Sequence, residues 1–271
     1  MSVIITGKTE AKVPVDDAER RGKLEKRLGK QMAQLNMKLS LYGPGDRIMV
    51  GISGGKDSYT MLHMLRRAQR ITPFDFDIFA FHLDQGHPGF PVHKIDDYLA
   101  SIGVEYAIER KDTYSIVEAK LEPGATPCSL CSRLRRAILY DAAVRHGCNK
   151  LALGHHREDL VNTTLLNLFY SGMLATMPPK LRSDDDRITV IRPLATCDER
   201  EIIEFSNLEG FPIVPCMLCG RGKNLKRDRV AQLVTELERE IPDIRRSIVA
   251  ALGNVRPSHL LDTNLYNHRE L

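Results

Sequence analysis

Tryptophan is absent from the 271-residue sequence, and aromatic residues make up only 6% of it. A surface built on stacked aromatic rings is therefore not expected. No apolar run approaches the roughly 20 residues that a membrane-spanning helix needs. The first residues contain only the short apolar stretch Val3 to Ile5, which does not fit a secretory signal. We expect a cytoplasmic protein without a membrane partner.

Charge is nearly balanced, because 39 Lys and Arg residues face 35 Asp and Glu residues, a net charge of +4. This mild excess permits a nucleic-acid partner without requiring one. The length suits one large domain, or one domain with a small appendage. Six cysteines in a chain without a secretory signal are expected to be reduced thiols. Four of them form two C-x-x-C pairs, Cys128/Cys131 and Cys216/Cys219, which suggests a metal.

Apolar periodicity predicts an α/β fold with a parallel sheet and helices on both faces. The predicted strands are 47–53, 76–83, 104–109, 150–154 and 188–191, with the loop that carries the first cysteine pair following the third. The predicted helices are 23–42, 57–70, 94–102, 133–146, 159–170 and 199–209. We expect a flexible arm at 1–22, a main domain at 23–215 with a cysteine-bearing insertion near 123–132, and a cysteine-containing helical appendage at 216–271.

Three loops follow predicted strands and so fall where ligands bind in parallel sheets: 53–58, 83–89 and 154–159. The first loop reads SGGKDS. Its glycines let the backbone approach a bound group, and amide groups at the start of the next helix form an anion site. Lys56 adds positive charge, and Ser53 and Ser58 add hydroxyl donors. A glycine turn with a solvated lysine is the plain structural alternative.

This loop is not a Walker A motif. Val50 occupies the place of the first glycine of that motif, and Asp57 follows the lysine where Ser or Thr would stand. In the other two loops, Asp84 and Asp159 taken singly are explained equally well as helix N-caps. His155 and His156 are explained equally well as packed or solvated side chains. Taken with the SGGKDS loop, these residues favour a nucleotide site.

The cysteine pairs leave three interpretations open. Four thiolates in two C-x-x-C pairs suit a structural zinc ion. They also suit an iron–sulfur cluster, or redox and persulfide chemistry on one cysteine. Cys148 and Cys197 stand alone and are expected to be buried. Basic residues follow the two pairs, and their charge favours the thiolate form of the cysteines and suits the phosphates of RNA. Solvated helix faces explain about half of them. These residues are Arg133, Arg135, Arg136, Arg221, Lys223, Lys226, Arg227 and Arg229.

Several strings together resemble a known family. The SGGKDS loop is similar to the PP-loop of ATP pyrophosphatases. The full set resembles the bacterial tRNA 2-thiocytidine synthetases, the tRNA-cytidine(32) 2-sulfurtransferases, from about Lys23 to Tyr266. The strings in chain order are RIMVGISGGKDSYTML, LDQGHPGFP, PCSLCSRLRRAILY, LALGHHRED, MPPKLRSDD, IRPLATCDEREI, FPIVPCMLCG and VRPSHLLDTNLY.

The resemblance implies a PP-loop ATPase fold, similar to adenine nucleotide α-hydrolases, that uses ATP and Mg²⁺ to thiolate cytidine 32 of tRNA. It implies a [4Fe–4S] cluster held by Cys128, Cys131 and Cys219, with Cys216 as a substitute for the third. It also implies catalytic roles for Lys56 and Asp57, persulfide sulfur from a cysteine desulfurase, and pairing of two copies. The ATP-binding residues implied are Ser53, Gly54, Gly55, Lys56, Asp57, Ser58, Asp84, Gly154, His155 and Asp159.

Two other functions fit parts of the pattern. One is a related tRNA-modifying PP-loop enzyme, a uridine thiolase or lysidine-type ligase, with a structural zinc. The other is a zinc-stabilised RNA-binding module without catalysis. The sequence also departs from the family pattern at Glu158, where the family commonly has Asp. If that carboxylate binds a metal, the longer side chain changes the geometry but not the charge.

Overall fold

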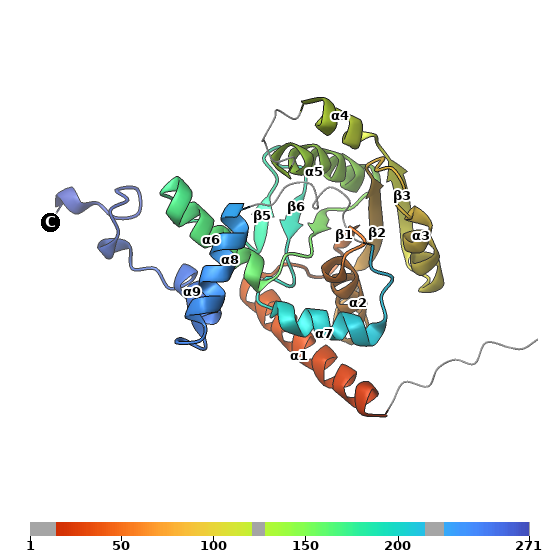
Figure 1. Cartoon of the computed structure of the whole chain (residues 1–271), viewed down its shortest axis with the longest axis horizontal. Helices are drawn as coiled ribbons and strands as arrows, with labels where there is room; N and C mark the ends of the chain where they lie inside the picture. The colour runs from red at the N-terminus through yellow and green to blue at the C-terminus, as the bar shows by residue number, and fades with distance from the viewer. Residues whose placement is uncertain (1–14, 121–127, 215–224, 271) are drawn as a thin grey trace, which may run out of the picture.

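The computed structural model describes residues 15–120, 128–214 and 225–270. These residues form a sheet with strand order β3-β2-β1-β4-β6-β5 (Figure 1). All neighbours pair in parallel except the edge strand β5, which is antiparallel to β6. The predicted parallel sheet with helices on both faces is confirmed. The strands are β1 Arg47–Ile52, β2 Asp77–Asp84, β3 Glu105–Arg110, β4 Lys150–Ala152, β5 Lys180–Arg182 and β6 Thr189–Ile191.

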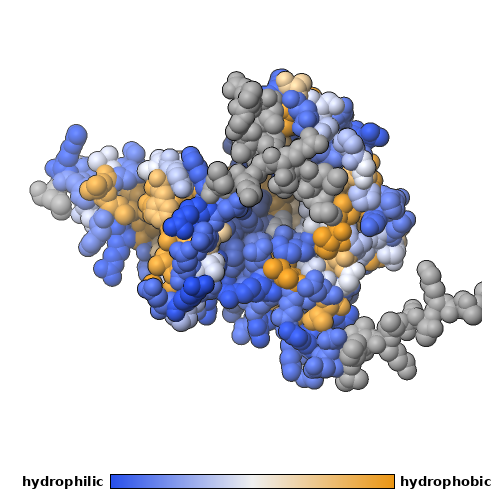
Figure 2. All heavy atoms as spheres, viewed as in Figure 1, coloured by the Kyte–Doolittle hydropathy of each residue, from blue (hydrophilic) through white to orange (hydrophobic). Residues whose placement is uncertain are grey.

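A group of three helices lies beyond the β5 edge of the sheet: α6 Arg157–Ser171, α8 Leu225–Leu237 and α9 Ile244–Leu252. They share a small core of Val161, Val234 and Ile244. The chain then continues through two short turns, Pro257–His259 and His268–Glu270. Hydrophobic side chains gather on the surface at this end of the molecule (Figure 2). None of the described helices is long and apolar enough to span a bilayer.

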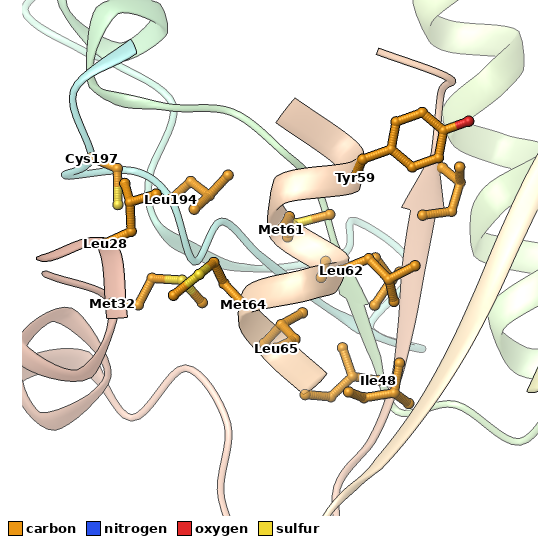
Figure 3. Packing of buried hydrophobic residues seen from close by; sticks show 14 of the residues in the cluster. Leu28, Met32, Ile48, Tyr59, Met61, Leu62, Met64, Leu65, Leu194 and Cys197 are labelled. Atoms are coloured by element: carbon orange, nitrogen blue, oxygen red, sulfur yellow. The ribbon is translucent and has the colours of Figure 1, made fainter. Parts of the chain in front are cut away.

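Four helices cover one face of the sheet: α1 Val15–Leu39, α2 Lys56–Ile71, α3 Val92–Ser101 and α7 Glu199–Glu209. Side chains of β1 alternate between the faces, so Ile48 and Val50 join this core while Met49 joins the other. This core combines aliphatic and methionine side chains of α1 and α2 with Tyr59 of α2 and Ile48 of β1, and Leu194 and Cys197 pack at its side (Figure 3). Because so many side chains of α2 are buried, the position of this helix is fixed, and with it the position of the loop that precedes it.

The opposite face is covered by α5 Cys128–Arg145, beside α4 Thr113–Lys120. Leu139, Ala142 and Ala143 of α5 pack on Met49, Phe79, Phe81, Leu83, Leu151 and Ile188. Cys148 is buried in this core, and Cys197 is buried in the other. The expectation that both are buried small side chains is confirmed.

Two predictions about local structure are wrong, and two elements were not predicted. Helix α1 begins at Val15, so residues 15–22 are not part of a flexible arm: Asp16 and Asp17 suit a helix amino end, and Arg21 lies 3.4 Å from Glu209 of α7. The first cysteine pair lies in the first turn of α5 rather than in a loop. Strand β5 and helix α4 were not predicted, because a three-residue exposed edge strand and a short helix carry little apolar pattern.

Truncating Leu62, which is fully buried in α2, tests the core beneath the loop. We expect Leu62→Ala to lower the free energy of unfolding by about 2–5 kcal/mol, because the cavity is closed in on all sides. Leu261→Ala is the matched control, since Leu261 is 96% exposed, and we expect a change within about 0.5 kcal/mol. Urea unfolding measures both, and equal effects would contradict the assignment of Leu62 to the core.

Candidate nucleotide and thiol site

The SGGKDS loop joins β1 to the amino end of α2 and is held by its own two serines. The backbone N–H of Ser53 donates to Ser58 Oγ at 3.2 Å, and Ser58 Oγ donates to the Gly55 carbonyl at 2.9 Å. The Gly55 N–H donates to Ser53 Oγ at 3.2 Å. The loop is therefore preformed at the start of a 16-residue helix, where free amide groups favour an anion.

Gly54 is required by both conformation and space. Its φ is +86°, and an added Cβ would lie 3.2 Å from Cβ of Val214. The Val214 N–H donates to the Gly54 carbonyl at 2.8 Å. The end of the described segment 128–214 is thus fixed against the loop, immediately before the second cysteine pair in sequence.

Gly154 brings the end of β4 against the start of α2. A Cβ at this position would lie 3.0 Å from the Asp57 carbonyl carbon and 3.2 Å from the Ser58 nitrogen. Only glycine allows two backbones to meet so closely. The loops after β1 and β4, two neighbouring strands, therefore form one continuous surface.

Lys56 is clamped between two carboxylates. Its Nζ lies 3.0 Å from Asp57 Oδ1 and 3.0 Å from Glu199 Oε1. Burial alone would lower the pKa of Lys56, but the two carboxylates outweigh burial and raise the pKa. Glu199 was not predicted as a site residue, because an acidic residue at the start of a helix fits an ordinary favourable charge at a helix amino end.

A buried network positions Glu199. Arg157 Nη2 lies 2.7 Å from Asp198 and 2.6 Å from Glu158, and the Glu199 N–H donates to Glu158 Oε2 at 2.9 Å. Burial opposes ionisation of Glu158, but His156, Arg157 and the Glu199 N–H together lower its pKa to about 2. The Glu at position 158 therefore joins the amino ends of α6 and α7.

The two histidines of the third loop have opposite environments. Burial lowers the pKa of His155 to about 4, aided by Arg192, whose Nε donates to His155 Nδ1 at 3.2 Å. Burial also disfavours charged His156, but Glu158, Asp159, Asp57 and Glu199 raise its pKa overall. His156 Nε2 lies 3.5 Å from Glu199 Oε1. His155 is the neutral member of the pair.

Asp84 and Cys131 both lie beside the loop that follows β2. Asp84 ends β2 and accepts the Gly86 N–H at 2.9 Å, which shapes the second loop. The adjacent Gln85 Oε1 lies 3.2 Å from Cys131 Sγ in the first turn of α5. Thus Cys131 is located at the same carboxyl edge of the sheet as the phosphate loop. Gln85 was not singled out from the sequence.

The remaining predicted residues divide into three groups. Arg133, Arg135 and Arg136 are exposed on α5, and Lys226 lies 4.7 Å from the centre of the Tyr170 ring. Asp159 accepts the His156 N–H at 3.2 Å and pairs with Arg227, close to the start of α8. The Cys128 side chain, Cys216, Cys219, Arg221 and Lys223 lie outside the described residues.

A family model described as a PP-loop domain matches residues 24–214. A tRNA-cytidine(32) 2-sulfurtransferase from Anaeromyxobacter dehalogenans (strain 2CP-C) is 52% identical over 92% of this chain and 85% of its own length. The chain belongs to this sulfurtransferase family. Marinobacter nauticus and Pseudomonas syringae pv. syringae have relatives of the same name, each 49% identical. The Marinobacter match covers 96% of this chain and 87% of its own length, and the Pseudomonas match 93% and 92%.

A solved structure has the same fold. The U34-tRNA thiolase NcsA from Methanococcus maripaludis, solved with its [4Fe–4S] cluster, superposes with a TM-score of 0.70. The match covers 86% of this chain and 79% of that chain, at 20% sequence identity. This likeness supports the PP-loop fold, and the family membership rests on the sequence relatives.

Replacing Gly154 tests the contact between the β4 and β1 loops. We expect Gly154→Ala to weaken ATP binding roughly ten- to hundredfold, because the methyl group forces the Asp57 backbone away from the anion site. Gly22→Ala is the matched control, since nothing lies within 4 Å of a Cβ there. Calorimetric titration of ATP measures both variants, and unchanged affinity in Gly154→Ala would contradict the close approach.

The pKa of His155 predicts a pH dependence of stability. The unfolded chain binds a proton near pH 6.5, whereas folded His155 binds one only near pH 4. The part of the free energy of unfolding that depends on neutral His155 is therefore fully present above pH 6.5. It falls by about 3 kcal/mol as the pH drops toward 4. We expect His155→Gln, which keeps an acceptor for Arg192, to reduce this slope in urea unfolding measured across pH 4–7. An unchanged slope would contradict the prediction.

Proposed function

We propose that the chain catalyses the ATP-dependent thiolation of cytidine 32 in tRNA, giving 2-thiocytidine. The observation that carries this proposal is that the phosphate loop follows β1 and Cys131 contacts the loop after the neighbouring strand β2, so that both lie at the carboxyl edge of the sheet. Val214 and Arg227, on either side of the second cysteine pair in sequence, contact this edge through Gly54 and Asp159. Membership in the sulfurtransferase family supports the same reaction.

In the first step the C2 oxygen of the base attacks the α phosphorus of ATP, and diphosphate leaves. The loop at 53–58 would bind the departing diphosphate through its backbone amides, and Lys56 would stabilise the charge that grows there. Glu199 and Asp57 hold the ammonium group of Lys56 in place beforehand. In the second step a sulfide-level sulfur bonds to C2, the C2–oxygen bond breaks, and AMP departs with that oxygen. Release of this sulfur from a persulfide donor breaks the S–S bond and takes two electrons from external thiols, which become a disulfide.

Two groups implied by the family fit the residues present. Asp57 and Glu199 offer the oxygen ligands that Mg²⁺ prefers, and both lie at the phosphate loop. Glu158 suits this role less, because Arg157 and the Glu199 N–H already engage its carboxylate. Cys131 offers a partly exposed thiol at the same edge. With Cys128 and Cys219, or Cys216 in its place, it would hold a [4Fe–4S] cluster that presents the sulfur to the base.

The partners belong to the proposal as well. The substrate is tRNA, which places the reaction in the cytoplasm, and the sulfur comes as persulfide from a cysteine desulfurase. Arg133, Arg135, Arg136, Arg221, Lys223, Lys226 and Arg227 are the proposed tRNA contacts. A second copy of the chain is also a proposed partner. Exposed apolar side chains at the end of α6 and just after it support such pairing: Leu168, Phe169, Tyr170, Met173 and Leu174.

Anaerobically purified protein tests the cofactor and the reaction together. We expect roughly four iron and four inorganic sulfide per chain, and formation of AMP and 2-thiocytidine when ATP, tRNA and a persulfide source are supplied. Lys56→Ala should reduce that rate at least about a hundredfold, because it removes the charge that faces the diphosphate. Lys94→Ala is the matched control, since Lys94 is exposed on α3.

The contradicting outcomes are distinct. Colourless protein that contains zinc and no iron would overturn the cluster. Normal 2-thiocytidine in tRNA from a strain that lacks the gene would overturn the target base. A harmless Lys56→Ala with no AMP formed would indicate a binding module rather than an enzyme.

A further inference from the structure

A groove of about 370 Å³ runs along the outer side of α5 and is separate from the phosphate loop. One wall is α5, with Arg133, Arg136 and Ala137, and Tyr140 lies deeper along it. The other wall is the turn between β5 and β6, with Asp184, Asp185 and Arg187. Nothing in the proposed chemistry of the phosphate loop uses this groove.

The groove begins within one helical turn of Cys131, on a different face of α5 from that thiol, and it leads away toward the opposite edge of the sheet. Arg133 follows Cys131 by two positions in α5, at the carboxyl edge of the sheet. The turn at 183–188 precedes β6, so it lies at the opposite edge. At 1.5 Å per residue the distance along the helix from Arg133 to Tyr140 is about 10 Å. A ligand that occupies both the thiol site and this groove must therefore extend over at least about 10 Å, as neighbouring nucleotides of an RNA strand do.

The charges that face the groove are unsatisfied within the part of the chain that the structure describes. Arg145, at the far end of α5, pairs with Glu109 at 2.5 Å. In contrast, no described side chain pairs with Arg133 or Arg136, and Asp184 likewise lacks an ion pair or hydrogen bond there. Both arginines are exposed, so they are available to an anionic partner.

The far wall is rigid. Arg187 is held by Asp141 at 2.8 Å and by Asp185 at 2.6 Å. Ser183 Oγ donates to Asp185 at 2.7 Å and accepts the N–H groups of Arg187 and Ile188, both at 3.1 Å. The groove is preformed, so a bound group would lose little affinity to the ordering of this turn.

The groove has the chemistry of a nucleotide site rather than a simple anion site. The half-buried Tyr140 ring offers a face for a base, and burial raises its pKa, which keeps the phenol neutral. The Asp184 carboxylate accepts from base amino groups, and the two free arginines suit the flanking phosphates. A purely phosphate-binding groove would not place two carboxylates in its wall.

We propose that the groove between α5 and the β5–β6 turn binds a nucleotide of the tRNA that neighbours the target base, with Tyr140 against its base and Arg133 and Arg136 on its phosphates. This inference rests on the proposed function, because it assumes that the substrate is tRNA. It adds Tyr140 and Asp184 to the RNA contacts and gives the strand a direction, away from the thiol site along α5.

Fluorescence anisotropy with labelled, unmodified tRNA tests the groove on the cluster-containing protein. We expect Arg136→Ala to raise Kd about tenfold at 0.1 M salt and to reduce the salt slope by about one. Tyr140→Leu should raise Kd about tenfold through lost stacking, while Tyr140→Phe stays within about twofold. Arg70→Ala is the matched control, because Arg70 is an exposed arginine of α2, on the other face of the sheet.

The outcomes separate the groove from the proposed function. If Arg136→Ala and Tyr140→Leu bind tRNA as tightly as the wild-type protein does, the proposed nucleotide site in the groove is overturned, and the proposed function still stands. The same result would follow if the arginines serve an acidic protein partner instead. Wild-type protein with no affinity for tRNA would overturn both. ATP affinity, measured in parallel, should be unchanged in every groove variant, and its loss would show misfolding rather than a local effect.

Discussion

The buried ion pairs of Arg157 hold the candidate site together. A buried guanidinium group is tolerated only when carboxylates surround it, and removing one partner of such a pair typically costs about 3–5 kcal/mol. Here Asp198 and Glu158 are those carboxylates, and they come from the starts of two different helices, α7 and α6. The position of Glu199, and through it the orientation of Lys56, follows from this arrangement. The apolar packing of α2 and the ion pairs of Arg157 therefore both position Lys56.

Much of the architecture could be predicted from the sequence. Helix 199–209 was predicted with its observed bounds, and strand 47–53 differs only at Ser53, because each has a clear apolar period and a clear stop. The loops at strand ends converge as expected, since the parallel topology requires it. The contact between Gly154 and Asp57 could not be predicted, because one glycine in a sequence does not indicate which backbone approaches it. Glu199, Gln85 and Arg192 were missed for a related reason: each acts through a partner more than 35 positions away.

The placement of the first cysteine pair in a helix preserves what the spacing suggested. Positions three apart in a helix lie on one face, so a helical backbone at 128–131 is compatible with the common ligand that the spacing predicted. The amino end of α5 also carries partial positive charge, which favours thiolates there. The exposed arginines Arg133, Arg135 and Arg136 follow on the same helix. One helix therefore carries both the first cysteine pair and the arginines that are proposed to contact tRNA.

The contacts of Val214 with Gly54 and of Arg227 with Asp159 have a thermodynamic meaning beyond placement. Both tie points lie on the loops that surround the phosphate site, while the segment between them in sequence carries the second cysteine pair. A ligand that shifts either loop must also shift these two contacts. Linkage then requires that a change at the contacts alters the affinity for that ligand equally. Under the proposed function, a metal group on these thiols and a nucleotide at the phosphate loop would change each other's affinity by the same factor.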